Sequence, residues 1–218
     1  MLDRFVRYAK INTRSDLNSN AVPTTKSQLD FLQMLEQELK ELGFSKISLD
    51  LEDAYLVACI PSNLPDGKIA PAIGFVAHVD TADFNAENIQ PQVHSNYDGK
   101  DVLLNSELGL MMRVEEFPNL KNYIGETLIT TDGTTLLGAD DKAGLVSILE
   151  ASIDLLVNPE IQHGDIWVAF GPDEEIGKGA HRFKAERMPA QFAYTLDSGV
   201  VGKLEYETFN AARAVVKI

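Results

Sequence analysis

Apolar residues recur at helical spacing in three segments of the chain, and each segment predicts an amphipathic helix. A short helix is expected over residues 2–9 and a longer one over 142–157. The clearest helix covers 25–42, where leucines recur at steps of three and four residues and Gly43 follows as the expected C-terminal cap. A further short helix is expected around 179–183.

Shorter apolar runs predict β-strands between these helices. The run at 72–79 is almost continuously apolar, which is typical of a central strand buried on both faces. Residues 127–130 and 134–137 flank a turn at Asp132-Gly133 and predict a β-hairpin. The remaining predicted strands are 55–60, 166–170 and 192–196.

The alternation of strands and helices predicts the fold class, an α/β fold with a mixed, largely parallel central sheet flanked by helices. Residues 83–126 carry no pattern that defines an element. In open sheets of this class, functional sites lie beyond the carboxyl ends of the strands. The polar residues that follow the predicted strands are therefore the candidates for chemistry.

The composition narrows the range of partners. The 33 acidic residues outnumber the 19 lysines and arginines, and the net charge of −14 argues against nucleic acid or an anionic membrane surface as a partner. The single cysteine, Cys59, favours a reducing compartment, and no apolar run is as long as a membrane span. We therefore expect a cytoplasmic protein.

Two predicted strands end in side chains that suit a metal ion. In FVAHVD, His78 and Asp80 are two residues apart and would project to the same face of a strand. The Asp80 carboxylate could then accept a hydrogen bond from one ring nitrogen of His78 while the other nitrogen faces a metal. In FAYTLDSG, Asp197 follows another apolar strand. A histidine and an aspartate at this spacing also occur by chance, so the pair alone is weak evidence.

Paired carboxylates also lie at two turns. GADDKAG places Asp140 and Asp141 at the start of the 142–157 helix, where they either stabilise the helix N-terminus or supply a carboxylate that bridges two cations. PDEEIGKG places Glu174 and Glu175 after the 166–170 strand. Such an acidic run is either a solvated loop or one metal ligand beside one proton acceptor.

One histidine with several carboxylates suits a catalytic zinc, manganese or cobalt site better than a structural zinc site, which favours thiolates. The number of carboxylates indicates two metals that share one ligand. A phosphate-handling enzyme is less favoured, because the chain has no glycine-rich phosphate loop followed by Lys and Ser/Thr.

The motifs HVDTAD, GADDKAG, PDEEIGKGA and ETFNAA, in this order, resemble those of the co-catalytic zinc exopeptidases and deacylases, and among these the tripeptide aminopeptidases of the peptidase T type. The resemblance extends from the first predicted helix to the last residue. It implies a cytoplasmic hydrolase with two zinc ions in the complete active site and a tripeptide as substrate. Two alternatives stay open: an N-acyl amino acid deacylase or desuccinylase of the same family, and a non-catalytic metal-binding fragment.

The resemblance also implies roles for individual residues. His78 and Asp197 would bind the first zinc and Glu175 the second. Asp140 would bridge both ions, and its peptide bond to Asp141 would be cis.

Two further residues would take part in catalysis. Asp80 would be the orienting carboxylate behind His78. Glu174 would be the general base that takes a proton from the zinc-activated water and then the general acid that protonates the leaving amine.

In the family, a lid domain interrupts the catalytic domain, which then resumes and supplies a final histidine ligand. His94, His163 and His181 match no motif position, and we expect them to be surface or packing residues. Residues 1–210 are therefore expected to form the N-terminal part of the catalytic domain and 211–218 the start of a strand towards the lid. The chain alone is expected to show little or no peptidase activity and to self-associate through surface that truncation exposes.

Overall fold

A mixed sheet of five strands, in the order β1-β2-β8-β3-β9, organises the chain. The computed structural model describes residues 1–197, 199, 201–207, 210, 212, 214 and 216. The β1/β2 and β2/β8 pairs are antiparallel, whereas β8/β3 and β3/β9 are parallel. The strands span Ser45–Leu49 (β1), Leu56–Ile60 (β2), Ile73–His78 (β3), Ile166–Gly171 (β8) and Phe192–Thr195 (β9). The predicted mixed α/β fold is confirmed, with two parallel and two antiparallel pairings in this five-stranded sheet as described.

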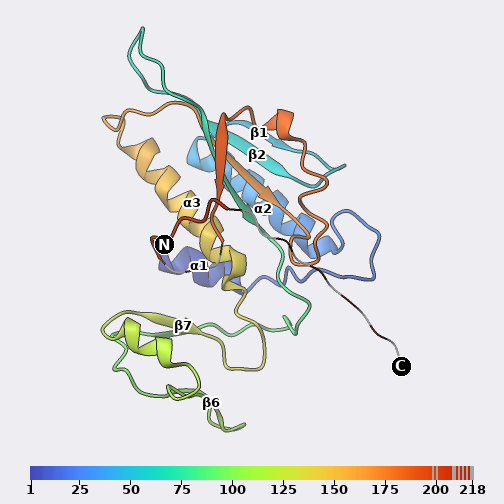
Figure 1. Cartoon of the computed structure of the whole chain (residues 1–218), viewed down its shortest axis with the longest axis vertical. Helices are drawn as coiled ribbons and strands as arrows, with labels where there is room; N and C mark the ends of the chain where they lie inside the picture. The colour runs from blue at the N-terminus through green and yellow to red at the C-terminus, as the bar shows by residue number, and fades with distance from the viewer. Residues whose placement is uncertain are drawn as a thin grey trace.

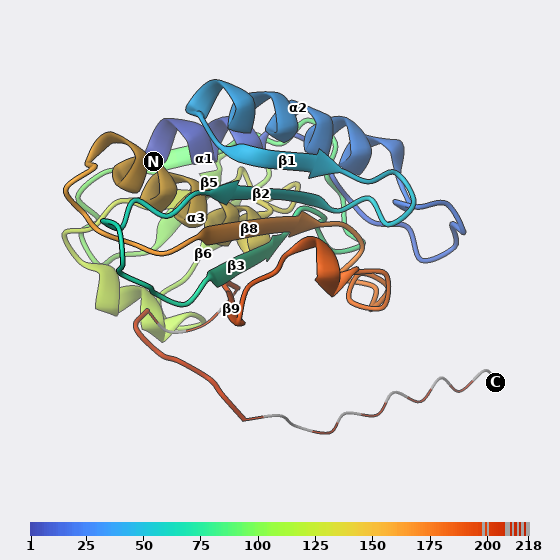
Figure 2. The same ribbon diagram turned by 90° about the horizontal axis from the view of Figure 1, so that it is seen from above.

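The predicted helices at 2–9, 25–42 and 142–157 are confirmed as α1 (Leu2–Ala9), α2 (Lys26–Leu42) and α3 (Ala139–Val157). Figure 1 shows them beside the sheet, and Figure 2 shows α1 and α2 over its β1 and β2 side. The leucine periodicity of α2 buries one face of that helix. Gly43 ends it in the left-handed region, at φ +91°, where its N–H is bonded to the carbonyls of the last turn.

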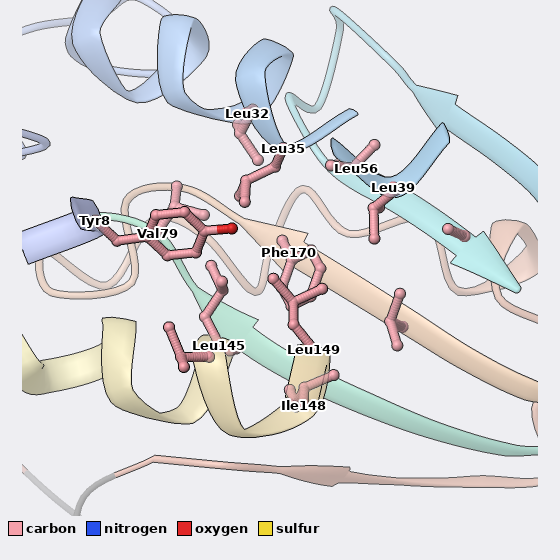
Figure 3. Close-up of a cluster of buried hydrophobic side chains, with 14 of the residues drawn as sticks. Tyr8, Leu32, Leu35, Leu39, Leu56, Val79, Leu145, Ile148, Leu149 and Phe170 are labelled. Atoms are coloured by element: carbon pink, nitrogen blue, oxygen red, sulfur yellow. The ribbon is translucent and has the colours of Figure 1, made fainter. Parts of the chain in front are cut away.

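All three helices contribute to one apolar core against a single face of the sheet. Side chains from the helices meet alternate residues of β2 and β8 there, among them Leu56 and Phe170 (Figure 3). The opposite face of these strands forms a second cluster, in which Trp167 packs with Met188 from the irregular segment before β9. The sheet is therefore covered by helices on one face and by this irregular segment on part of the other.

The predicted hairpin at 127–137 is wrong. Leu128–Thr130 (β7) pairs with Gln92–His94 (β4), and residues 134–137 form no strand. The Thr131 hydroxyl donates to the Thr135 carbonyl, and the Leu136 N–H donates to the carbonyl of Asn85. The chain after the turn is thus held by a distant loop instead of by the strand before it.

The predicted helix at 179–183 is also wrong, because this segment is a series of turns. The N–H groups of Lys178 and Gly179 both donate to the Asp173 carbonyl, which closes the turn before a helix can form. A short 3₁₀ helix follows at Ala185–Arg187 (η2).

The sequence also left two regions unassigned. Strand β1 was not predicted, because five residues with polar alternate positions give too short a signal. Residues 83–126 form small elements that lie below the main sheet in Figure 1 around a minor core of their own. These are β4, Val102–Asn105 (β5), Leu110–Met112 (β6) and the 3₁₀ helix Pro118–Tyr123 (η1). Among the described residues, no helix is both long and apolar enough to cross a membrane.

Candidate metal centre

The candidate residues meet at one edge of the sheet. The strands β8, β3 and β9 are parallel neighbours, so their carboxyl ends lie together, and α3 begins beside them. His78 is the last residue of β3, and Asp197 follows the end of β9 by two residues. Asp173 to Glu175 follow β8 after Pro172. The location expected from the strand ends is therefore the one observed.

Three carboxylates surround one nitrogen of the His78 ring. His78 Nε2 lies 3.0 Å from Asp140 Oδ1, 3.9 Å from Glu174 Oε2 and 3.9 Å from Asp197 Oδ2. His78 itself is buried, whereas the side chains of Asp140, Glu174 and Asp197 are about half exposed. The site is thus an open cluster with a buried histidine at its base.

Within the part of the chain that the structure describes, two overlapping groups of side chains could hold a metal ion. One consists of His78, Asp140 and Glu175, and the other of His78, Asp141 and Asp197, with the ligand atoms of each group within 4.8 Å of one another. The four predicted metal ligands all belong to these two groups. Asp141 is the one member for which the sequence predicted no ligand role.

The carboxylate of Asp141 is engaged in holding the start of α3. Its Oδ1 accepts the N–H of Gly144 at 3.1 Å, and its Oδ2 accepts the N–H of His78 at 3.2 Å. Asp140 and Asp141 have non-helical backbone angles, and the bond between them is cis, as the resemblance implied. Asp140 Oδ1 lies beside His78 Nε2, whereas the carboxylate of Asp141 joins β3 to α3 through its two hydrogen bonds.

The other nitrogen of His78 faces Asp80, and the backbone carbonyl of that residue lies nearer to it than the carboxylate does. His78 Nδ1 lies 3.0 Å from the Asp80 backbone carbonyl and 3.4 Å from its carboxylate. Because β3 ends at His78, Asp80 is not on the strand face that the two-residue spacing assumed. In the neutral ring, Nδ1–H can donate to this carbonyl, and Nε2 then presents its lone pair to a metal.

The Asp80 carboxylate has a second function that the sequence did not indicate. It is fully buried and accepts the N–H of Glu174 at 2.9 Å and the N–H of Glu175 at 3.2 Å. One residue therefore fixes the His78 ring through its carbonyl and the two glutamates through its carboxylate.

The cluster concentrates negative charge in a partly buried place. Burial lowers the pKa of His78, but Asp80, Asp141 and Asp197 outweigh it and raise that pKa to about 10. Burial, with the nearby carboxylate of Asp197, raises the pKa of Asp141 to about 8. Burial and neighbouring carboxylates likewise raise the pKa of Asp140, Glu174 and Glu175.

This donor set fits a divalent cation. The oxygen donors and one imidazole are ligands of catalytic zinc, manganese and cobalt. A bound cation would also offset the repulsion that raises the carboxyl pKa values.

The other three histidines lie outside the cluster. His94 Nε2 is 2.9 Å from the hydroxyl of Thr130, His163 Nδ1 is 2.8 Å from the Gly164 carbonyl, and His181 is exposed. The expectation that they are packing or surface residues is confirmed.

The amino-acid sequence was compared with those of known proteins. No protein-family model matches the chain. Peptidase T from Fusobacterium nucleatum is 58% identical over 216 residues, which are 99% of this chain and 52% of that protein. Peptidase T from Streptococcus thermophilus is 55% identical over 215 residues, with 98% of this chain and 52% of that protein covered. The chain is thus similar in sequence to peptidase T over nearly all of its own length. It spans about half the length of the curated peptidase T relatives that it matches.

Solved structures agree with the peptidase T relationship. The crystal structure of the aminopeptidase PepT from Bacillus cereus superimposes with a TM-score of 0.63 at 26% identity, over 90% of this chain and 42% of that one. A tripeptidase from Staphylococcus aureus gives a TM-score of 0.62 at 24% identity, over 91% of this chain and 43% of that one, and at this identity it supports the fold alone.

Proposed function

We propose that residues 1–210 form part of the catalytic domain of a metal-dependent aminopeptidase that releases the first residue of tripeptides. The convergence of Asp140, Glu174 and Asp197 on His78 Nε2 is the observation that carries this proposal. Similarity to peptidase T supports the substrate class. The proposed strand at 211–218 includes residues outside the described part of the chain. The proposed cytoplasmic location is supported by the single cysteine and by the resemblance.

The proposed ligands divide between two ions. His78 and Asp197 would hold the first, Asp140 would be shared, and Glu175 would hold the second. Zinc is the proposed metal, and manganese or cobalt would accept the same donors. When bound, such ions lower the pKa of a coordinated water and polarise the peptide carbonyl.

Glu174 is the proposed proton carrier. Its N–H is fixed on Asp80, but its side chain is 57% exposed, and it reaches to 3.9 Å from His78 Nε2. Burial raises the pKa of Glu174, which favours reversible proton transfer. We propose that Glu174 accepts a proton from the attacking water and delivers it to the leaving amine.

Zinc stoichiometry tests the site directly. Calorimetric titration of the metal-free chain should show at least one saturable zinc site, lost or strongly weakened in Asp140→Ala. Asp154→Ala is the matched control, because Asp154 is an exposed aspartate of the same helix, and it should titrate like the parent. The proposed centre would be refuted if the parent showed no saturable zinc binding. It would also be refuted if Asp140→Ala bound zinc as well as the parent does.

Activity assays test the reaction class. We expect little or no turnover of tripeptides by this chain alone, since only Asp140 and Glu175 are proposed for the second ion. Rapid tripeptide hydrolysis would contradict that incomplete second site. Hydrolysis of N-acyl amino acids in preference to tripeptides would instead favour a deacylase.

A further inference from the structure

The loop that carries Glu174 and Glu175 is anchored by a buried aspartate that the proposed reaction does not use. Asp173 is fully buried immediately before Glu174. Its φ of +60° lies in the left-handed region, which only Gly, Asn and Asp adopt at modest cost. A buried charge in this conformation requires compensation from its surroundings.

That compensation comes from two parts of the chain. The Asp173 carboxylate accepts the N–H of Thr24 at 3.1 Å, the Thr24 hydroxyl, and Gln28 Nε2 at 2.9 Å. It also accepts Arg182 Nη1 at 2.6 Å. The N–H of Asp173 donates to Gln28 Oε1 at 3.1 Å. The side chain of Gln28 is therefore hydrogen-bonded to both the backbone N–H and the carboxylate of Asp173.

The backbone carbonyl of Asp173 closes the loop from the other side. It accepts the N–H groups of Lys178 and Gly179, both at 3.0 Å. Gly179 must be glycine, because a Cβ there would lie 2.5 Å from the Pro172 carbonyl. Asp173 thus joins the start of α2, the end of β8 and the 178–182 turn.

This anchor acts on the two residues that follow it. The N–H groups of Glu174 and Glu175 are bonded to the Asp80 carboxylate, and Asp80 also orients His78. The two glutamates are therefore held by Asp80 at their amides and by Asp173 at the turn that leads into them.

A purely structural role is the competing explanation, and the chain contains a matched example of one. Asp53 is also a buried aspartate paired with an arginine, Arg187, at 2.9 Å. It likewise accepts a backbone N–H, from Tyr55 at 2.8 Å. The residues beside Asp53 contain no candidate ligand, so its loss should affect stability alone.

We propose that Asp173 is a positioning residue that sets Glu174 and Glu175 at the metal centre. The expected effect on metal binding rests on the proposed function. The effect on the arrangement of the loop does not, and it can be tested without metal.

The test compares Asp173→Asn with Asp53→Asn. Asparagine tolerates the left-handed backbone, but its amide group would face Thr24 or Arg182, which donate to the present carboxylate. Arg182→Gln is a second variant that removes one donor and keeps Asp173 in place, for use if Asp173→Asn does not fold.

Two readouts are taken on the whole chain. Amide hydrogen exchange of Glu174 and Glu175 should accelerate at least about tenfold in Asp173→Asn and stay unchanged in Asp53→Asn. Cobalt(II) titration followed by visible absorption should show about tenfold weaker binding and an altered spectrum in Asp173→Asn only.

The outcomes separate this inference from the proposed function. Unchanged exchange at both glutamates in a folded Asp173→Asn, or equal changes in Asp53→Asn, would overturn the positioning role. If the parent chain binds no cobalt, the proposed function fails, and the exchange data still decide whether Asp173 sets the loop.

Discussion

At the scale of single residues, the candidate site brings carboxylates close enough together to raise their pKa values. Burial and the neighbouring Asp197 raise the pKa of Asp140, although His78 partly opposes the shift. An ionised Asp140 therefore carries a free-energy cost in the metal-free chain at neutral pH, which a cation would remove.

Replacing Asp140 by Asn should consequently separate stability from metal binding. In the presence of a chelator, the urea midpoint of Asp140→Asn should equal or exceed that of the parent, because the repulsion is gone while the size is kept. Excess zinc at about 100 times its dissociation constant should stabilise the parent by about 2.7 kcal/mol and the variant far less. A clear loss of stability in chelator would show that Asp140 is structural.

The sequence identified most of the residues of the cluster, because strand ends and turn motifs place them in the right elements. It did not predict the contact between His78 and the Asp80 carbonyl, which depends on β3 ending at His78. It gave Asp173 no role, because a run of three acids contains no information about which one is buried. Burial and hydrogen bonding arise from elements far apart in the chain, and a local motif cannot encode them.

At the scale of elements, α3 must approach β9 closely to bring its first turn to Asp197. Gly144 makes this approach possible: a Cβ there would collide with the Leu196 carbonyl and the Asp141 carboxylate. The helices themselves were predictable from apolar spacing, whereas the hairpin was not, because β7 pairs with the distant β4.

Gly144→Ala should therefore separate α3 from the end of β9. We expect a loss of about 1–3 kcal/mol of unfolding free energy from overpacking, together with weaker zinc binding. Ser147→Ala on the same helix is the control and should change stability by less than about 0.5 kcal/mol. Urea unfolding and zinc titration measure the two effects, and an unchanged zinc affinity in Gly144→Ala would contradict this account of the α3–β9 contact.

The contact between α1 and α2 depends on an ionised glutamate. Glu38 accepts Arg7 Nη2 at 2.9 Å and the Tyr8 hydroxyl at 2.7 Å. Burial raises the pKa of Glu38, but Arg7 and Tyr8 outweigh it, and the net pKa lies below its ordinary value. The stability that this carboxylate contributes is thus present above its unfolded-state pKa and is lost as the pH falls through its folded-state pKa.

Glu38→Gln should lower the free energy of unfolding by about 1.5–3 kcal/mol at neutral pH. This loss relative to the parent should shrink at acidic pH, where Glu38 of the parent becomes protonated. Glu41→Gln, at an exposed position of the same helix, should change little at either pH. Urea unfolding at neutral and acidic pH provides the comparison. A difference that grows on acidification would reverse the predicted sign.

At the scale of the whole molecule, the sheet has an open edge. Among the described residues, β9 pairs with β3 alone. Its aromatic side chains are only partly covered: Phe192 is 47% and Tyr194 39% exposed. An exposed edge strand with apolar side chains favours pairing with another chain.

We therefore expect the isolated chain to self-associate through β9. The weight-average mass in sedimentation equilibrium should rise with protein concentration, and Phe192→Lys should reduce this rise, because a lysine on an edge strand disfavours strand addition. Ile69→Lys is the control, since Ile69 is 97% exposed in the loop before β3 and is not part of a strand. A parent that stays monomeric at all concentrations would exclude self-association. An equal effect of Ile69→Lys would place the association elsewhere, because only Phe192→Lys changes the β9 edge.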